Sequence, residues 1–281
     1  MKVYVTGATG FIGRHLTRRL EQEGFQVYKS KVDITDAYAV KREIEEASPD
    51  KVVHLAAIVS TPWADEADWY SIDVNVKGTY NVAKYSKQVG ADFIYASSTS
   101  IYKPTSDVIT ESSPIGPTTI YNLTKYMGEE VVVNVYGNNV LILRFSHIYG
   151  PDGDHCSIPM KIIRSSISGY PAVILASPKS IRSYLYISDL IDLLVRVLTS
   201  NIKGTYNVSS CEYMPLEEVA LIVGEELTKA GFGLTKIVWR PEADYMGSHL
   251  VSSKKIMDEL GWCPRVKFME GIAKCIESFR Q

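Results

Sequence analysis

The stretch KVYVTGATGFIG, residues 2–13, decides the fold of this chain. A short apolar run leads directly into three glycines with the spacing G-x-x-G-x-x-G, at Gly7, Gly10 and Gly13. Gly7 permits a tight turn after a strand, Gly10 lets the backbone approach a pyrophosphate, and Gly13 lets the next helix pack closely on the sheet. Phosphates then lie at the positive end of the helix dipole. Because the glycines follow a predicted strand and open a predicted helix, the stretch predicts dinucleotide binding.

The rest of the first half alternates short β-rich runs with amphipathic helical patterns. The strand-like runs are KVYVTG at 2–7, FQVYK at 25–29, KVVHLAA at 51–57, DFIYASS at 92–98 and VLILRFSHIYG at 140–150. This alternation predicts right-handed crossovers and a doubly wound parallel sheet of the Rossmann type. The runs are apolar almost throughout, as strands buried on both faces should be.

The character of the sequence changes after Gly150. Pro and Gly occur there at irregular intervals, and helical patterns return only further on, for example ISDLIDLLVRVLTS at 187–200. We therefore predict an α/β protein with a Rossmann domain over residues 1–150. Residues 151–281 are expected to form mainly a smaller, mixed α/β substrate-binding lobe, with some segments returning to the first domain.

Composition limits the partners and the compartment. The 281 residues are 46% hydrophobic and 22% charged with a net charge of −2, so neither nucleic acid nor a membrane is expected as a partner. The four cysteines, at 156, 211, 263 and 275, are far apart and predict buried free thiols, with no metal site. The chain opens on a predicted strand and its apolar stretches are interrupted by charge, so we expect a cytoplasmic protein without a signal peptide.

The second predicted strand leaves the choice between NAD and NADP open. NAD-binding sheets commonly carry an acid at the end of this strand for the ribose 2′-hydroxyl, but the strand ends YKSK at 28–31. Arg14, Lys29 and Lys31 are positioned to neutralise a 2′-phosphate, or are solvated surface charges. Asp33, followed by Ile34, is expected at the end of the next short strand, near the adenine.

Two polar side chains four residues apart are the first candidates for chemistry. Tyr121 and Lys125 lie at the start of a predicted helix, where this spacing puts both on one face. A lysine ammonium and an oxidised nicotinamide nearby would favour the phenolate and lower the tyrosine pKa. Ser98 ends an apolar strand, at the sheet edge where open α/β sheets bind ligands, and its hydroxyl can orient a substrate oxygen.

Six motifs together resemble the extended short-chain dehydrogenase/reductases. These motifs are TGATGFIG, HLAA, DVNVKGT, SSTSIY, YNLTK and LRFSHIYGP, in the order in which that family has them. The resemblance runs from Lys2 to the C-terminus, and RSYLYISDL at 182–190 looks like a substrate-side signature of the family. It implies an NAD- or NADP-dependent enzyme, an oxidoreductase or an isomerase, that acts on a nucleotide sugar. Family members are often dimers through two helices of the first domain, so a homodimer is a further expectation.

The resemblance also implies roles for individual residues. Tyr121 resembles the family's catalytic acid–base, and Lys125 resembles its partner, which also holds the nicotinamide ribose. Ser98 matches the family's Ser/Thr position, and the neighbouring Thr99 is the alternative at that position. Arg182 and Arg240 match arginines that bind the substrate diphosphate, and His147 stands where an Asn often contacts the substrate. The remaining matches are cofactor-contacting positions: Gly7, Gly10, Phe11, Ile12, Gly13, Arg14, Asp33, Ile34, Leu55, Ala56, Ala57 and Asn75.

The chain departs from the family pattern in ways that bear on the reaction. Dehydratases of the family carry an Asp–Glu pair where this chain has Thr99–Ser100, so dehydration is not expected. The short link between the second strand and DITD, at 33–36, and the missing ribose-binding acid favour reduction of a 4-keto-6-deoxy sugar nucleotide. Epimerisation at C4 is the close alternative. A dinucleotide-sensing module without chemistry is a further hypothesis, which the presence of both Tyr121 and Lys125 disfavours.

Overall fold

The computed structural model describes residues 1–59, 68–153 and 157–280. The chain divides into two compact units that alternate along the sequence. The first unit consists of Met1–Lys103, Pro114–Phe145 and Ile191–Tyr206, and the second of Pro104–Ser113, Ser146–Leu190 and Asn207–Gln281.

A six-stranded sheet carries the first unit, with the strand order β10-β5-β4-β3-β1-β2. The strands are β1 (Lys2–Thr6), β2 (Gln26–Lys29), β3 (Lys51–His54), β4 (Asp92–Ser98), β5 (Val140–Phe145) and β10 (Gly204–Val208). Pairing from β2 through β1, β3 and β4 to β5 is parallel, which confirms the predicted fold class. The strand order reverses at β1, between β2 and β3, and ligands of such sheets bind at the carboxyl ends of the strands beside this point.

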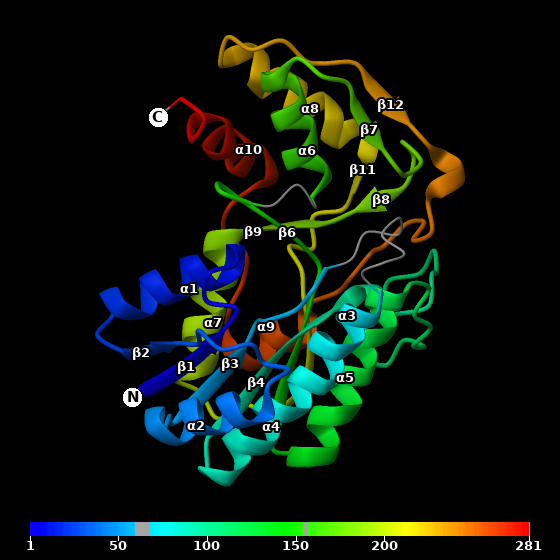
Figure 1. Cartoon of the computed structure of the whole chain (residues 1–281). Helices are drawn as coiled ribbons and strands as arrows, with labels where there is room; N and C mark the ends of the chain where they lie inside the picture. The colour runs from blue at the N-terminus through cyan, green and yellow to red at the C-terminus, as the bar shows by residue number, and fades with distance from the viewer. Residues whose placement is uncertain (60–67, 154–156, 281) are drawn as a thin grey trace. The chain divides into compact units, whose positions relative to one another are not determined.

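Helices cover the sheet, as Figure 1 shows for α2, α4 and α5. The helices of the first unit are α1 (Phe11–Gln22), α2 (Ala37–Ala47), α3 (Asp68–Ile72), α4 (Thr79–Gln88) and α5 (Ile120–Tyr136), with a π-helical segment at Asp73–Gly78. Helix α4 packs between α2 and α5. The residues in register across the sheet beneath them are apolar and buried: Tyr4, Val52, Phe93 and Val140. Packing of these residues fixes the register of the strands and therefore where their carboxyl ends lie relative to one another.

The second unit has short strands and four helices within the described residues. Its strand pairs are β6 (His147–Tyr149) with β9 (Tyr184–Tyr186), β7 (Ala172–Ile174) with β12 (Ile237–Trp239), and β8 (Ile181–Arg182) with β11 (Met214–Pro215). The helices are α6 (Ile158–Ser168), α8 (Leu216–Lys229), α9 (Lys254–Leu260) and α10 (Phe268–Glu277), and α7 (Ile187–Leu198) is shared between the units. Helix α8 contacts both α6 and α10.

Two predicted strands differ from the structure. The run at 140–150 is not one strand: β5 ends at Phe145, the Ser146 amide donates to the Val208 carbonyl, and β6 pairs in another sheet. Residues 32–36 do not form a strand either. Asp33 instead lies in a turn, where its carboxylate accepts hydrogen bonds from the Thr35 amide and hydroxyl, both at 2.9 Å. Local hydrogen bonds of an Asp side chain compete with strand pairing in this way.

The prediction of buried thiols is wrong for one cysteine. Cys275 is buried and Cys211 is half-buried, but Cys263 is exposed, and all three are free. Cys156 lies outside the described residues.

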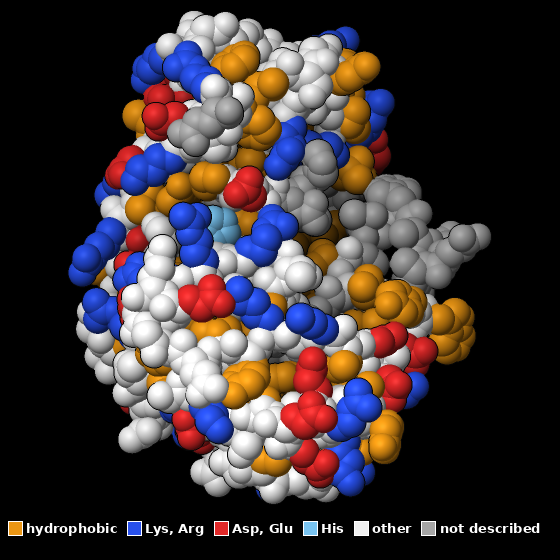
Figure 2. Space-filling view, turned by 60° about the vertical axis from the view of Figure 1, so that its left-hand side comes forward, with side chains coloured by type: hydrophobic (Ala, Val, Ile, Leu, Met, Phe, Trp, Pro, Cys, Tyr) orange, Lys and Arg blue, Asp and Glu red, His pale blue; other side chains and the backbone are white. Residues whose placement is uncertain are grey.

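Among the described helices, none has the length and apolar character to cross a membrane. Lys and Arg are interspersed with Asp and Glu on the face drawn in Figure 2, in keeping with a net charge of −2.

Candidate active site

The turn after β1 has the backbone geometry that the glycine spacing predicts. Gly7 has a φ of +65°, and a Cβ added there would lie 2.7 Å from the Ala56 nitrogen. A Cβ at Gly13 would lie 2.1 Å from the Gly7 carbonyl oxygen, so α1 reaches the turn only with glycine at this position. Gly10 is different, because its Cβ would meet only the Gly7 oxygen, at 3.2 Å. The turn therefore fits a pyrophosphate: two glycines are required by packing, and the third leaves backbone accessible.

The predicted cofactor residues around this turn occupy two neighbouring strand ends. The amides of Leu55 and Ala56, directly after β3, both donate to the Thr6 hydroxyl at 3.2 Å, which ties the end of β3 to the end of β1. Ala57 follows them and is half-buried. These residues and the glycine turn lie beside the point where the strand order reverses.

The other predicted cofactor residues differ in how far their side chains are buried. Phe11 and Ile12 are half-buried at the start of α1, and Arg14 is exposed with its guanidinium donating to the Thr9 carbonyl at 3.2 Å. Ile34 is buried, and a Cβ on Gly78 of the π-helical segment would lie 2.6 Å from its side chain. The Ile34 side chain thus contributes to the core, while Asp33 next to it is exposed.

An acid does lie at the end of β2, although the strand sequence has none. Glu43 reaches there from α2, where its carboxylate accepts hydrogen bonds from the Ser30 hydroxyl at 2.9 Å and the Lys31 amide at 3.1 Å. The Tyr4 hydroxyl donates to the same carboxylate. The sequence analysis missed Glu43 because it searched only the strand. The available signal was its spacing: Glu43 lies three residues after Val40 and four before Ala47, next to the apolar face of α2.

A chain of buried hydrogen bonds connects β1 to α5 through a histidine. His54 bonds Thr6 through Nδ1 at 2.8 Å and Thr79 through Nε2 at 3.0 Å. The Thr79 hydroxyl donates to the Asn75 carbonyl at 2.7 Å, and the Asn75 amide donates to the Thr124 hydroxyl at 3.0 Å. Asn75, a predicted cofactor residue, is therefore buried and fixes α5, which carries Tyr121 and Lys125, relative to the glycine turn.

Lys125 is buried one turn after the predicted catalytic tyrosine on α5. Its Nζ lies 4.4 Å from the centre of the Tyr95 ring, and burial lowers its pKa to about 7, against the opposing influence of Glu129. Burial also raises the pKa of Tyr95 well above its usual value, so this phenol stays protonated. Glycine is needed at position 128, where a Cβ would lie 2.0 Å from the Tyr95 hydroxyl. The Lys125 ammonium therefore loses its proton near neutral pH, well below the usual range for a lysine.

Tyr121 lies in the first turn of α5, one turn before Lys125. The Thr119 hydroxyl caps this helix by accepting from the Asn122 amide at 3.2 Å. Tyr121 is half-buried, and its phenol contributes to the raised pKa of Tyr95, so the two tyrosines and Lys125 are neighbours. The structure brings Tyr121 and Lys125 together as the helical spacing predicts.

The two candidate hydroxyls after β4 face different surroundings. The Ser98 hydroxyl is half-buried and lies 2.7 Å from that of Ser100, which in turn bonds Asn122 of α5. The Thr99 hydroxyl is buried and donates to the Phe145 carbonyl at 3.3 Å. Ser98 is therefore the better candidate for a substrate contact, and the neighbouring Thr99 is engaged with β5.

A buried ion pair lies one turn beyond Lys125. Arg144 donates to both carboxylate oxygens of Glu129, at 2.9 and 2.7 Å, and its third nitrogen donates to the Tyr102 hydroxyl at 2.6 Å. The Ser97 hydroxyl also donates to Glu129. The sequence analysis did not identify this pair. Arg144 inside the apolar strand β5 was the available signal, because charges are rarely buried unless paired.

Of the predicted substrate residues, Ser98 and Thr99 belong to the first unit, and His147, Arg182 and Arg240 belong to the second. Arg182 is buried and forms an ion pair with Asp244 at 3.1 Å, while Arg240 is exposed. Burial, Arg182 and His249 hold the pKa of His147 well below its usual value, so its imidazole is neutral. Its Nδ1 is buried without a hydrogen-bond partner among the described residues. The guanidinium of Arg182 is thus already engaged, whereas Arg240 is accessible to an anion.

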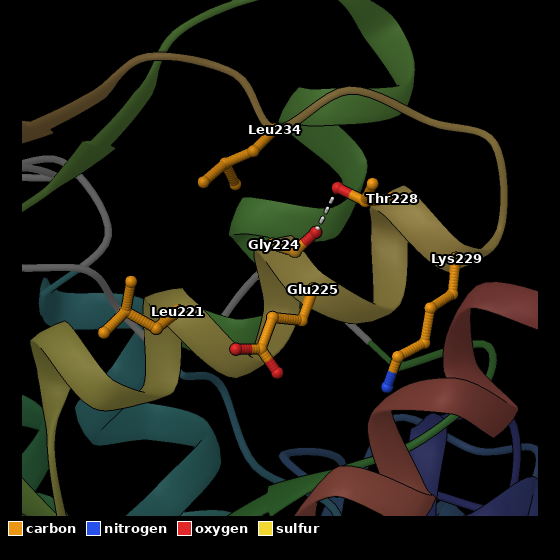
Figure 3. Close-up of a pocket in the computed structure, with 6 residues that line it drawn as sticks. All are labelled: Leu221, Gly224, Glu225, Thr228, Lys229 and Leu234. Atoms are coloured by element: carbon orange, nitrogen blue, oxygen red, sulfur yellow. Dashed lines mark hydrogen bonds between the residues drawn. The ribbon is translucent and has the colours of Figure 1, made fainter.

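A surface hollow elsewhere in the second unit has no link to these motifs. Figure 3 shows it over α8, with Leu221 and Leu234 on its walls and Glu225 and Lys229 beside them. The Thr228 hydroxyl donates to the Gly224 carbonyl at 2.8 Å and is thereby engaged within the helix. Over the described part of the chain, no three His, Cys, Asp or Glu side chains gather as metal ligands would.

Known proteins resemble this chain in sequence and in fold. The model of the NAD dependent epimerase/dehydratase family matches residues 3–209. UDP-glucuronic acid decarboxylase 6 of Arabidopsis thaliana is 26% identical, covering 100% of this chain and 89% of that protein. A putative UDP-glucose 4-epimerase of Methanocaldococcus jannaschii is also 26% identical, covering 98% and 97%. The crystal structure of Thermus thermophilus UDP-glucose 4-epimerase with NAD is 27% identical over 100% and 99% of the two chains, with a TM-score of 0.87. The predicted resemblance is confirmed, and the chain belongs to the NAD-dependent epimerase/dehydratase family.

Proposed function

We propose that this chain transfers hydride between NAD(P) and C4 of a nucleoside-diphosphate sugar. The observation that carries the proposal is the buried Lys125 one turn after Tyr121, on a helix to which the Ser98 hydroxyl is connected through Ser100 and Asn122. The glycine turn supports a dinucleotide pyrophosphate, and the bound dinucleotide would supply or accept the hydride.

The roles of the three side chains follow from their surroundings. Tyr121 exchanges a proton with the C4 oxygen, and Ser98 holds that oxygen by a hydrogen bond. Lys125 lowers the tyrosine pKa when it is charged, since a nearby positive charge favours the phenolate. Because the pKa of Lys125 is about 7, a charged ligand bound next to it would change the fraction of Lys125 that is protonated.

The carboxylates near the site do not support dehydration. Removing a hydroxyl needs an acid beside the leaving group, and the two residues after Ser98 offer only hydroxyls. Those hydroxyls are engaged with Phe145 and Asn122. Glu129, the buried acid on the same helix as Lys125, is ion-paired with Arg144.

Between the two remaining reactions, epimerisation at C4 now has the better support. The sequence favoured reduction on two grounds, the short link after β2 and the missing ribose-binding acid. Glu43 removes the second ground, because its carboxylate lies at the end of β2. Relatives named as 4-epimerases match nearly the full length of this chain, as do relatives named as UDP-glucuronic acid decarboxylases, so the preference for epimerisation rests on Glu43. Reduction of a 4-keto-6-deoxy sugar nucleotide stays the second candidate on the short link alone.

The first experiment is to denature the purified protein and identify the released cofactor by absorbance and mass. One equivalent of bound NAD supports an epimerase, which must keep its cofactor through the rotation of the keto sugar, and UDP-sugars are assayed next. An empty protein that binds NADPH supports a reductase, to be assayed with 4-keto-6-deoxy sugar nucleotides. Turnover that is lost in Tyr121→Phe, with dinucleotide binding retained, supports the assigned chemistry. Binding of a dinucleotide without turnover of any sugar nucleotide would instead favour the sensing module.

Two further expectations belong to this proposal. Arg240, His147 and Arg182 are proposed to contact the nucleotide sugar, and Arg182 must then share its guanidinium with Asp244. The homodimer is proposed to form through α4 and α5, because α5 exposes an apolar stripe at Ile120, Leu123 and Met127.

A further inference from the structure

A chain of three hydrogen bonds leads from the candidate Ser98 into helix α5. The Ser98 hydroxyl lies 2.7 Å from the Ser100 hydroxyl, which donates to the Asn122 side-chain carbonyl at 2.7 Å. The other end of the Asn122 amide donates to the Thr118 hydroxyl at 3.4 Å. Asn122 is buried, with 2% of its surface exposed, and directly follows Tyr121. Ser100 stands at the position where dehydratases of the family carry the glutamate of their Asp–Glu pair.

Counting protons shows what this arrangement does to Ser98. A serine hydroxyl has one proton, and an amide oxygen only accepts hydrogen bonds. Ser100 therefore uses its proton on Asn122 and must accept from Ser98, whose own proton is then also used. The Ser100 amide donates to Ser98 at 3.2 Å, which occupies one of its lone pairs. In this orientation Ser98 has only acceptor capacity left for a substrate.

Turning the Asn122 amide by 180° reverses every bond in the chain. The amide nitrogen then donates to Ser100, Ser100 donates to Ser98, and the Ser98 proton is available to the substrate. The amide oxygen faces Thr118, whose hydroxyl can donate. The oxygen and nitrogen of an amide have nearly the same shape, so both orientations fit the same space.

We propose that Ser100 and Asn122 are positioning residues that set whether Ser98 donates or accepts a hydrogen bond. The inference rests on the proposed hydride transfer. A C4 ketone only accepts hydrogen bonds, so the productive form has the Asn122 nitrogen facing Ser100. In the opposite form Ser98 competes with Tyr121 for the proton of a C4 alcohol. The direction of this relay therefore decides whether Tyr121 receives that proton.

The test uses Asn122→Asp, which has the same shape but presents only acceptors when ionised. It locks Ser98 in the accepting form, and we expect kcat to fall by about 100-fold, the usual effect of losing one oriented donor at a reacting oxygen. Ser100→Ala breaks the relay and frees the Ser98 proton, so this variant should lose less than about 10-fold. The double variant Ser100→Ala/Asn122→Asp should be faster than Asn122→Asp alone, because the acceptor no longer reaches Ser98.

This rescue separates the relay from a structural or charge effect. The double variant carries the same new charge as Asn122→Asp, and Asn134→Asp on the exposed side of α5 is a further charge control. A double variant as slow as Asn122→Asp, or slower, would overturn the relay. Should the wild-type chain turn over no sugar nucleotide, the proposed function fails separately. The relay is then tested by the Asn122 side-chain amide resonances of the protein, which should shift in Ser100→Ala, and unchanged resonances would contradict it.

Discussion

At the scale of single residues, burial controls the charges of the site. Lys125 has no carboxylate bonded to its ammonium among the described contacts and rests on the Tyr95 ring. His54 lies in the same interior, where burial first and then the Lys125 charge lower its pKa to about 3. The histidine is therefore a neutral link in the hydrogen-bond chain, and the lysine is the group whose charge can change near neutral pH.

Lys125 should make the stability of the cofactor-free protein rise with pH. Its pKa is about 7 in the folded protein and 10.5 in the unfolded chain, so the unfolded chain binds the extra proton between these values. The unfolding free energy of wild type should therefore gain about 2 kcal/mol over Lys125→Met between pH 7 and 9, at about 1.4 kcal/mol per pH unit. Urea denaturation at both pH values measures this difference. Parallel pH curves for the two proteins would show that Lys125 stays charged.

Glu43 should discriminate against the 2′-phosphate of NADP. Its carboxylate is held at the end of β2 by Ser30 and Lys31, where a second negative charge is repelled. Glu43→Gln should raise the affinity for NADP relative to NAD by about 10-fold, which corresponds to 1.4 kcal/mol. Calorimetric titration with each dinucleotide measures the ratio, and Glu46→Gln on the exposed side of α2 is the control. If the ratio of NADP to NAD affinity stays unchanged, Glu43 stabilises the fold but does not select the cofactor.

At the scale of secondary structure, the site depends on where elements begin and end. The glycine turn sets the start of α1, and Thr119 sets the start of α5. The hydrogen-bond chain through His54 holds β1, β3 and α5 at fixed heights. The functional side chains are therefore positioned by helix starts and strand ends, with little dependence on long loops.

Gly13→Ala and Gly10→Ala should separate folding from dinucleotide binding. The new methyl at position 13 would lie 2.1 Å from the Gly7 oxygen, so we expect unfolding to become easier by about 3 kcal/mol or more. At position 10 the backbone is compatible with alanine and the new methyl would lie 3.2 Å from the Gly7 oxygen, a tight contact, so the stability loss should be smaller than at position 13 while NAD affinity falls. Thermal unfolding and NAD titration of both variants check this. Equal stability losses would contradict the assignment of Gly10 to the cofactor.

At the scale of the whole molecule, the chain builds two units from interleaved segments. Ile191–Tyr206 returns to the first unit, and Pro104–Ser113 leaves it for the second. The last strand of the sheet, β10, thus comes from a distant part of the sequence. Helix α5 has apolar residues on two sides: Val132 and Tyr136 are buried in the core, whereas Leu123 and Met127 are exposed at the surface.

The exposed side of α5 should be the contact between two copies of the chain. Leu123→Glu together with Met127→Glu places charges on this stripe, so light scattering should detect a monomer in place of the wild-type dimer. Leu221→Glu, which changes a more exposed apolar residue on α8, should leave the dimer intact. A monomeric wild type, or dissociation by the control variant, would contradict the proposed interface.

The sequence by itself determined the five parallel strands β1 to β5, the glycine turn and the position of Tyr121 and Lys125 one turn apart on a single helix. Each of these depends on residues close together in the chain, where strand periodicity, helical spacing and glycine conformation act locally. The tertiary structure decided what depends on distant residues. Glu43 reaches the end of β2 from a helix, Arg144 neutralises Glu129, and β10 joins the sheet from the second half of the chain. Asp33 does not lie in the predicted strand, because its carboxylate accepts hydrogen bonds from the amide and hydroxyl of Thr35, and these local bonds compete with strand pairing. Contacts of this kind are selected by packing and charge compensation in the folded interior, which a linear pattern does not encode.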